Sequence, residues 1–270
     1  MGSPRLGVCG WPVAHSRSPA MHNAALAALG LHDWRYQKLP IPPDAFADAV
    51  RALERAGFAG INVTIPHKEA ALAVADAATD TARAVGAANT LTFAAGRIEA
   101  DNTDVQGLLD AIAPVCDPRG RRALVLGAGG AGRAAVHALV TADAAEVMVW
   151  NRTPERAERL CRELGGRPVR AAEPADVIVQ CTSVGLKGLD APFKRLPIDA
   201  DTFGAGICVI DLVYRAEDTT FLAAARSRGA DVIDGLEVLV GQGALALERW
   251  TGRPAPRDVM RRAVISPASP

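Results

Sequence analysis

A lysine stands at an unusual place in the segment GINVTIPHKE, residues 60–69. Ile61, Val63 and Ile65 alternate as in a strand, and Pro66 is typical of a helix start, so Lys68 falls in the first helical turn. That end of a helix carries partial positive charge and disfavours an ammonium group. A lysine placed there releases its proton more readily, as proton exchange in catalysis requires. The alternative is an exposed lysine paired with an acidic neighbour.

A glycine loop follows an apolar run in the second half of the chain. Residues 123–126 (ALVL) predict a strand that enters Gly127-Ala-Gly-Gly-Ala-Gly132, and a helical pattern follows. Glycines in this arrangement let the backbone approach a pyrophosphate at the helix N-terminus. The loop lacks the Gly-Lys-Ser/Thr ending of a nucleoside-triphosphatase loop. We therefore expect dinucleotide binding rather than a purely structural turn.

The residues at the end of the next predicted strand indicate which dinucleotide is bound. The strand EVMVW ends in Asn151-Arg152-Thr153, and Arg156 lies one turn later. NAD sites usually present a carboxylate there to the ribose hydroxyl, and this chain has none. Arginine binds phosphate through charge-assisted hydrogen bonds, so the segment favours NADP(H) over NAD(H). The alternative is a solvated helix start.

The elements that must position these groups fall into two series. The first hundred residues predict a β-α-β-α-β pattern followed by a hairpin, and residues 114–122 (PVCDPRGRR) predict a boundary. After it, apolar runs alternate with helical stretches, as in a parallel sheet covered on both faces. The expected strands are residues 5–10, 34–41, 60–66, 123–126, 146–151, 176–182, 207–214 and 230–235, and the expected helices include 18–30, 43–57, 66–78 and 235–252.

Composition narrows the class of protein. The chain has 270 residues, 49% of them hydrophobic and only 4% aromatic, and its formal net charge is +0. Neutral charge gives no electrostatic case for nucleic acid or an acidic membrane surface. Five scattered cysteines without a C-x-x-C pair predict buried thiols in a reducing cytosol rather than disulfides or a metal site. No signal peptide or membrane span is apparent, so a cytoplasmic protein is expected.

Seven segments in one order resemble the shikimate dehydrogenase family: AHSRSPAMHN, GINVTIPHKE, GAANTL, DNTD, GAGGAGRA, NRT and DGLEVLVGQ. The resemblance implies an α/β fold, an N-terminal α/β substrate domain plus a Rossmann-type doubly wound parallel sheet. It implies a substrate domain at 1–103, an NADP-binding domain at 104–236, and C-terminal helices at 237–270 that return to the substrate domain. The implied reaction is the reversible NADPH-dependent reduction of 3-dehydroshikimate to shikimate, in chorismate and aromatic amino acid biosynthesis.

The resemblance also assigns roles to residues. It implies Lys68 and Asp104 as the catalytic pair, NADP as cofactor, a small-molecule substrate, no metal, and a monomer or homodimer. Substrate contacts are implied at Ser16, Ser18, Thr64, Asn89, Tyr214 and Gln242. Cofactor contacts are implied at Gly127, Ala128, Gly129, Gly130, Ala131, Asn151, Arg152, Thr153, Arg156, Thr182, Leu212 and Gly235.

The residue types agree with these roles. The substrate is a polyhydroxylated ring with a carboxylate, and Ser16 and Ser18 stand at a predicted helix start, where hydroxyls and free N–H groups bind anions. Ser18 is also expected to be the N-cap, with Pro19 as the first helical residue. Asn89 and Gln242 suit ring hydroxyls, although surface or capping roles are equally open from type alone.

The chain departs from the family pattern at several positions and leaves rival activities open. Val105, Gln180, Leu186, Arg215-Ala216 and Gly243 stand where glycine, asparagine, methionine, Asn-Pro and alanine are usual. Rival readings are a quinate or aminoshikimate dehydrogenase, a folate-linked methylene dehydrogenase of similar plan, and a non-catalytic NADP-binding sensor. The two serines and the Asn-Arg-Thr turn favour shikimate with NADP.

Overall fold

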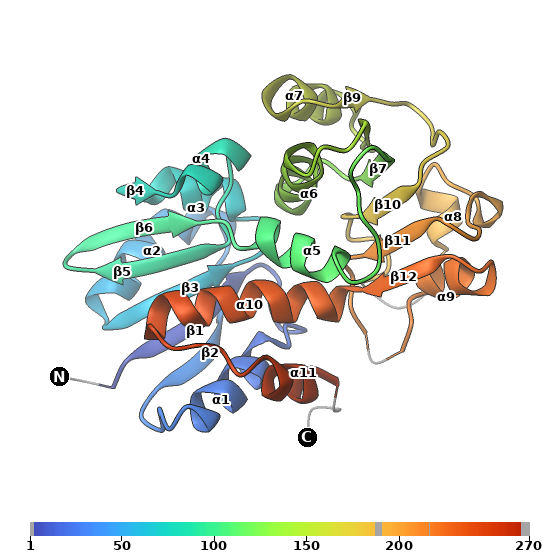
Figure 1. Cartoon of the computed structure of the whole chain (residues 1–270). Coiled ribbons are helices and arrows are strands. Elements are labelled where there is room, and N and C mark those ends of the chain that lie inside the picture. Colours follow the sequence, from blue (N-terminus) through green and yellow to red (C-terminus); the bar gives the residue numbers. More distant parts are fainter. Residues whose placement is uncertain (1–2, 187–190, 216, 266–270) are drawn as a thin grey trace. The chain divides into compact units, whose positions relative to one another are not determined.

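The chain folds into two compact units, each with its own six-stranded sheet (Figure 1). The computed structural model describes residues 3–186, 191–215 and 217–265. The first unit combines residues 1–107 with 239–270, and the second comprises residues 108–238. Two separate α/β units with parallel-rich sheets match the predicted fold class. The roles of the sequence segments 1–103, 104–236 and 237–270 remain predictions at this stage.

The sheet of the first unit is mixed, with the order β2-β1-β3-β5-β6-β4. β1 pairs in parallel with β2 and β3, whereas β5 is antiparallel to both β3 and β6. Ala95 and Gly96 both have positive φ and close the predicted β5–β6 hairpin in two residues. The strands are β1 (Arg5–Gly10), β2 (Arg35–Pro40), β3 (Phe58–Val63), β4 (Ala77–Ala78), β5 (Thr90–Ala94) and β6 (Arg97–Asp101).

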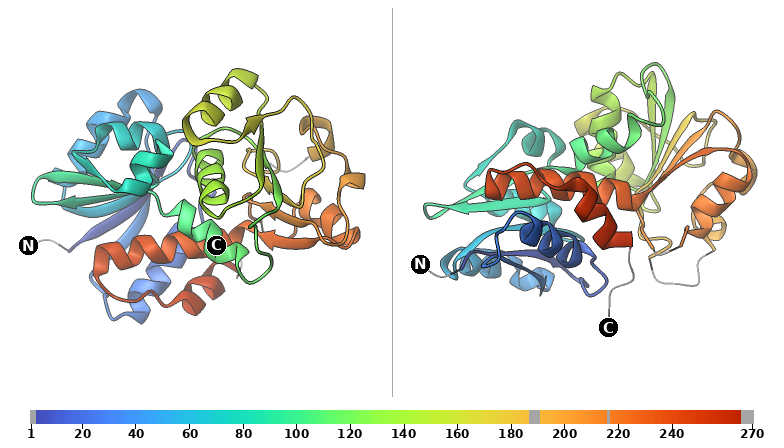
Figure 2. Two further views of the ribbon diagram at one scale, coloured as in Figure 1. Left: turned by 45° about the horizontal axis from the view of Figure 1, so that its top comes forward. Right: turned by 60° about the horizontal axis from the view of Figure 1, so that its bottom comes forward.

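Helices cover both faces of this sheet. Ile61 belongs to a buried cluster with Phe46 and Val50 of α2 and Ala71 of α3, while the neighbouring Gly60 faces Trp250 of α10 from the opposite side. α1 and α11 pack side by side, as both views in Figure 2 show. The helices of this unit are α1 (Ser18–Ala28), α2 (Phe46–Arg55) after the 3-10 turn η1 (Pro43–Ala45), α3 (Lys68–Val74), α4 (Asp80–Val85) and α11 (Arg257–Ile265).

Two local predictions for this unit are wrong. β3 ends at Val63, so Ile65 is not a strand residue; its side chain is 54% exposed. The helix predicted over residues 66–78 ends at Val74, and β4 and α4 follow it. In alanine-rich sequence the apolar period does not mark this break, because alanine fits a helix and a short strand alike.

The sheet of the second unit is parallel throughout, with the order β12-β11-β10-β7-β8-β9. Leu124, Ile178 and Val209 form one cluster with Phe221 of α9, so α8 and α9 cover that face. α6 and α7 pack on each other beside β7 and β8. The strands are β7 (Arg122–Leu126), β8 (Glu146–Trp150), β9 (Arg167–Pro168), β10 (Val177–Gln180), β11 (Cys208–Asp211) and β12 (Asp231–Asp234); the helices are α6 (Gly130–Thr141), α7 (Pro154–Leu164), α8 (Pro192–Arg195), the 3-10 turn η2 (Ala200–Thr202) and α9 (Thr220–Ser227).

Two further helices, α5 (Asp104–Ile112) and α10 (Gly235–Thr251), carry the chain from one unit to the other. Within the first unit they approach closely, because a Cβ on Gly107 would lie 2.6 Å from the backbone nitrogen of Gln242. Gly241 faces the Gly107 carbonyl in the same way, with 3.1 Å to a Cβ. Because glycine has no side chain, these two positions let α5 and α10 approach each other closely, and this approach determines where Gln242 lies.

The burial of the cysteines and the lengths of the helices can be compared with what the composition predicts. Cys9, Cys116, Cys161 and Cys208 are buried, as expected, and Cys181 is half-buried. Among the residues described, no helix is long and apolar enough to span a membrane.

A buried histidine gives the first unit a pH-dependent stability. His22 is 0% exposed and stacks on Tyr36 with ring centroids 4.2 Å apart, and burial lowers its pKa to about 3. The unfolded chain takes up a proton near the ordinary value of 6.5, whereas the folded chain stays neutral. His22 therefore contributes stability above pH 6.5 that is lost progressively as the pH falls.

We expect His22 alone to lower the free energy of unfolding by about 2 kcal/mol between pH 7 and pH 5. His22→Phe keeps a stacked ring without a proton site, so urea denaturation of the variant should show a shallower decline over that range. Parallel declines for the wild type and the variant would contradict this assignment.

Candidate functional site

Lys68 and Asp104 form an ion pair in the first unit. Lys68 Nζ lies 2.6 Å from Asp104 Oδ2, and the two side chains are only 13% and 16% exposed. Each residue is the first of its helix, Lys68 of α3 and Asp104 of α5. A helix N-terminus favours the carboxylate and disfavours the ammonium, so the pairing offsets the unfavourable placement of the lysine. Because the pair is partly exposed, it can form hydrogen bonds with a ligand, and such a pair can donate or accept a proton.

The residue before the lysine is anchored independently. His67 is buried, its Nε2 lies 2.8 Å from the Ile41 carbonyl oxygen, and its ring stacks on Phe46. Burial lowers the pKa of His67, and the contact with Ile41 opposes that shift. A ring held in this way fixes the start of α3 and therefore the Cα of Lys68.

Asn89 holds Asp104, the acidic member of the ion pair. Its Nδ2 donates to Asp104 Oδ1 at 2.9 Å and also lies 3.1 Å from Gln242 Oε1. Its Oδ1 accepts from the Thr103 backbone N–H at 2.8 Å. Asn102 Oδ1 accepts from the Asp104 backbone N–H at 3.1 Å. Asn89 therefore fixes the Asp104 carboxylate, and Asn102 and the Thr103 contact fix the backbone that carries it.

A buried polar chain behind Asn89 was missed in the sequence. Tyr36 donates to Asn62 Oδ1 at 2.7 Å, and Asn62 Nδ2 donates to Thr90 Oγ1 at 3.2 Å, while Thr90 donates to Asn89 Oδ1 at 3.1 Å. The asparagine within the otherwise apolar run of β3 was the available signal, because such a group needs partners when buried. The chain links the sheet to the ion pair.

The predicted substrate residues Ser16, Ser18 and Thr64 lie at the carboxyl ends of β1 and β3. The Trp11 N–H donates to the Ile65 carbonyl at 3.0 Å, so the loops that follow these two adjacent strands are joined. The N-cap predicted at Ser18 is wrong: Arg17 is the N-cap, Ser18 is the first helical residue, and Ser16 Oγ accepts from the Ser18 N–H at 3.3 Å.

The glycine loop of the second unit has the geometry that an anion cradle needs. Gly127 has φ of +115°, and a Cβ on Gly132 would lie 2.0 Å from the Gly127 carbonyl oxygen, so both positions require glycine. A Cβ on Gly129 would meet nothing within 4 Å, which leaves open space in front of the N-terminus of α6. Gly130 and Ala131 open that helix, whose first N–H groups receive no side-chain cap.

The segment after β8 is tied to this loop. Asn151 Oδ1 accepts from the Ala128 N–H at 3.0 Å, and Asn151 Nδ2 donates to the Thr153 carbonyl at 2.8 Å. Arg152 is exposed, and Arg156 lies exposed in the first turn of α7. The segment that carries these two guanidinium groups is thus tied to the glycine loop through Asn151, and the donor set fits a dinucleotide that carries an extra phosphate on its ribose.

Of the remaining predicted cofactor residues, Thr182 borders the same loop, while Leu212 and Gly235 lie beside each other. A Cβ on Gly127 would lie 3.0 Å from Thr182 Cγ2, and one on Gly235 would lie 2.8 Å from the Leu212 carbonyl oxygen. Tyr214, predicted to contact substrate, is half-buried and belongs to this second unit, unlike the other predicted substrate residues.

Most departures from the family pattern have a local structural reason. Val105 is 6% exposed at the start of α5. A Cβ on Gly243 would lie 2.2 Å from Met21 Cε, so glycine there accommodates the methionine. Gln180 is buried and hydrogen-bonded, Arg215 donates to the Gly185 carbonyl, and Leu186 is 42% exposed. Ala216 lies outside the described residues.

Among the side chains that the structure describes, no group of three or more His, Cys, Asp or Glu residues is arranged to hold a metal ion.

Comparison with known proteins gives matches along nearly the whole chain. Residues 8–91 match the shikimate dehydrogenase substrate binding domain, residues 111–184 match shikimate / quinate 5-dehydrogenase, and residues 235–265 match the shikimate 5'-dehydrogenase C-terminal domain. A shikimate dehydrogenase (NADP(+)) of Paracoccus denitrificans is 44% identical over 98% of this chain and 96% of its own length. The chain belongs to the shikimate dehydrogenase family.

Solved structures of the family share the fold. The shikimate dehydrogenase of Aquifex aeolicus is 36% identical, with a TM-score of 0.91 and 98% coverage of both chains. The shikimate 5-dehydrogenase of Thermus thermophilus, in complex with NADP(H) and shikimate, is 44% identical, with a TM-score of 0.87, and the match covers 96% of this chain and 98% of that one. The predicted family and fold class are therefore confirmed.

Asn89 should matter more to stability than a hydrogen-bonded asparagine that touches no charge. We expect Asn89→Ala to lower the free energy of unfolding by about 3 kcal/mol, because it leaves a carboxylate oxygen and a buried N–H without partners. Asn23 bonds only the backbone of Tyr36, at 2.9 Å on each side, and is the matched control.

Urea denaturation measures both variants. In Asn23→Ala the free energy of unfolding should fall by about half as much as in Asn89→Ala, since only neutral groups are left unpaired. Equal losses in the two variants would contradict a special role for the Asn89–Asp104 contact.

Proposed function

We propose that this chain catalyses the reversible NADPH-dependent reduction of 3-dehydroshikimate to shikimate. The observation that carries the proposal is the Lys68–Asp104 ion pair, 2.6 Å long and held by Asn89, in a chain whose family relatives are NADP-dependent shikimate dehydrogenases. The reaction belongs to the shikimate pathway of aromatic amino acid and chorismate biosynthesis.

NADP is the cofactor that the second unit fits. When bound, NADPH supplies the hydride that reduces the carbonyl carbon. The N–H groups at the start of α6 would bind its pyrophosphate, which the loop of Gly127, Ala128, Gly129, Gly130 and Ala131 would approach in the open space at Gly129. Arg152 and Arg156 bind the ribose 2'-phosphate, with Asn151 and Thr153 holding their segment, while Thr182, Leu212 and Gly235 border the nicotinamide end.

Lys68 exchanges the proton of the reaction. In the reductive direction its ammonium donates to the oxygen that gains negative charge, and in the oxidative direction the neutral amine takes up the hydroxyl proton. Asp104 holds the amine by the 2.6 Å contact and restricts its orientation. Asn89 keeps the carboxylate turned toward Lys68 by occupying its other oxygen.

The substrate ring is held by hydroxyl and amide groups. Ser16 and Ser18, at the start of α1, bind the carboxylate together with the free N–H groups there. Thr64, Asn89 and Gln242 bind ring hydroxyls, and Tyr214 contributes from the second unit. The domain roles follow from this: residues 1–103 and 237–270 bind substrate, and residues 104–236 bind NADP.

Quinate or aminoshikimate remains the alternative substrate within the same mechanism. The family match over residues 111–184 carries both substrate names, shikimate and quinate, so the assay must compare the two. We further propose a cytoplasmic location, because the five cysteines are scattered and form no C-x-x-C pair, and a monomer or homodimer.

The test of the function is an absorbance assay of nicotinamide reduction by the purified chain. Shikimate with NADP⁺ should give turnover in the ordinary enzyme range of about 1–10³ s⁻¹, and NAD⁺ or quinate should be used much more slowly. Binding of NADP⁺ without turnover of either substrate would reject the proposal in favour of a sensor.

Replacing the proposed acid/base tests the mechanism within that assay. Lys68→Ala should lower kcat by about 10²- to 10⁴-fold, because the proton transfer is no longer assisted. Lys194→Ala, an exposed lysine of α8, is the matched control and should leave kcat unchanged. Near wild-type turnover in Lys68→Ala would exclude the proposed chemistry.

A further inference from the structure

A buried carboxylate in the second unit takes no part in the chemistry described so far. Asp211 ends β11 and is 1% exposed. Its Oδ1 accepts from the Val213 N–H at 3.0 Å and from Gln180 Nε2 at 3.2 Å, and its Oδ2 accepts from Thr219 Oγ1 at 2.6 Å. A carboxylate removed from water is unfavourable unless such donors surround it, so its presence needs a reason.

Gln180 connects Asp211 to the loop after β10. It lies opposite Asp211 in the register of β10 and β11 and is 1% exposed. Its Nε2 also donates to the Val184 carbonyl at 2.9 Å, and its Oε1 accepts from the Thr182 N–H at 2.5 Å. Thr182 Oγ1 in turn accepts from the Val184 N–H at 3.1 Å. The loop of residues 181–186 is therefore shaped by the glutamine side chain.

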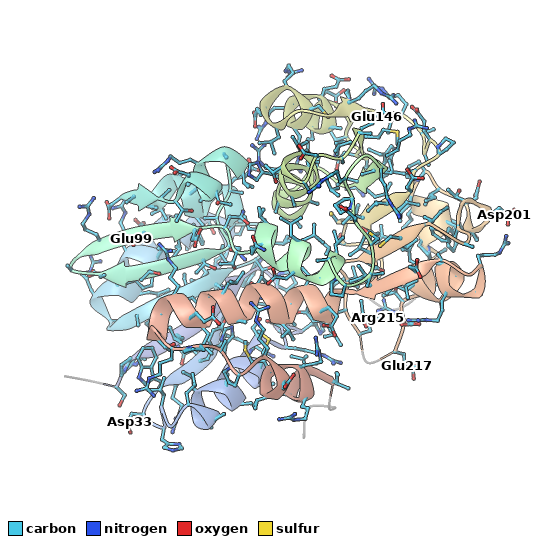
Figure 3. All side chains as sticks on the ribbon, viewed as in Figure 1. Asp33, Glu99, Glu146, Asp201, Arg215 and Glu217 are labelled. Atoms are coloured by element: carbon cyan, nitrogen blue, oxygen red, sulfur yellow. The ribbon has the colours of Figure 1, made fainter. Side chains whose placement is uncertain are left out.

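Thr219 connects Asp211 to the segment after β11. Thr219 is the N-cap of α9, and its Oγ1 accepts from the Leu222 N–H at 3.1 Å. Because that oxygen already accepts, its hydroxyl proton is directed at Asp211. Arg215, labelled in Figure 3, donates to the Gly185 carbonyl and joins the two segments.

Both segments border the proposed cofactor site. Thr182 lies against Gly127 of the glycine loop, and the Leu212 carbonyl lies against Gly235. One carboxylate thus holds, through Gln180, Val213 and Thr219, the two segments that carry Thr182 and Leu212 at the carboxyl ends of β10 and β11. The adenosine-binding groups, Asn151 and Arg152, follow a different strand, β8.

We propose that Asp211 is a positioning residue for the nicotinamide end of the cofactor site, acting through Gln180 and Thr219 on the loops that carry Thr182 and Leu212. The inference rests on the proposed function, since it names what orders one end of that cofactor site. Removing the Asp211 contacts should misplace the nicotinamide end and leave the adenosine end intact.

Burial and the hydrogen bonds to Asp211 act on its pKa in opposite directions. Burial raises its pKa to about 7, the bonds from Thr219 and Val213 lower it, and the other charged groups that face it are Asp234 of β12, which raises it, and Arg215, which lowers it. The folded pKa lies above the ordinary 3.8, so stability from this residue is present below pH 3.8 and is lost as the pH rises from there through about 7. Since all three contacts are donors, the less stable, ionised form is the one that holds both loops.

The test uses Asp211→Asn, Thr219→Val and Thr219→Ser, with three measurements on the full chain. The first is the dissociation constant of adenosine 2',5'-bisphosphate, which probes the adenosine end alone. The second is the change in NADPH fluorescence on binding, which reports the surroundings of the reduced ring. The third is kcat with shikimate and NADP⁺.

We expect Asp211→Asn and Thr219→Val to lower kcat about tenfold or more, because misplacement near the reacting atoms is costly. The NADPH fluorescence change should shrink with it, while the adenosine 2',5'-bisphosphate dissociation constant stays constant. Thr219→Ser keeps the hydroxyl and should restore both signals. Asp176→Asn is the matched control: this carboxylate also accepts a backbone N–H, that of Arg122 at 2.9 Å, but at the amino end of β10.

Unchanged kcat and fluorescence in Asp211→Asn and Thr219→Val would overturn the proposal. So would equal losses in Thr219→Ser and Thr219→Val, or a parallel loss of adenosine 2',5'-bisphosphate binding, since these mark a general structural effect. If Asp211→Asn does not fold, the two Thr219 variants decide. A wild type that binds NADPH but does not oxidise shikimate would reject the proposed function, and the fluorescence test of Asp211 would still stand.

Discussion

The ion pair between Lys68 and Asp104 is the interaction on which the first unit depends. An ammonium at the N-terminus of α3 is unfavourable by itself, and the carboxylate at the start of α5 compensates it at 2.6 Å. Asn89, which the polar chain from Tyr36 reaches, donates to that carboxylate, and Asn102 accepts from the Asp104 backbone N–H. Tyr36, a sheet residue, is therefore coupled to the lysine that we propose as the acid/base.

The second unit uses the same device for a different purpose. There the buried carboxylate of Asp211 gathers donors from Gln180, Val213 and Thr219, and it orders backbone rather than an amine. In both units several chain segments contact a single carboxylate, which lies at the end of a strand or at the start of a helix. Burying such a group destabilises the fold unless every acceptor is satisfied, which favours a single arrangement of the surrounding loops.

The sequence predicted the positions of helices and strands more fully than the contacts between their side chains. Alternating or continuous apolar runs located the strands of both sheets other than the two-residue β4 and β9, and the glycine spacing located the turn at Gly127, because each signal is local. Ser18 as N-cap and Ile65 as a strand residue were wrong, since the neighbouring backbone, not the residue type, set those boundaries. The Asn62–Thr90 and Gln180–Asp211 contacts join residues 28 and 31 positions apart, and no local pattern predicts such partners.

A crystal structure of the chain with shikimate bound would show whether Lys68 is placed to exchange the proton. We expect Lys68 Nζ to lie within about 3 Å of the ring hydroxyl that is oxidised, with the Asp104 contact retained. A lysine nitrogen turned to solvent, or a ring whose reactive hydroxyl faces another acid or base, would contradict it.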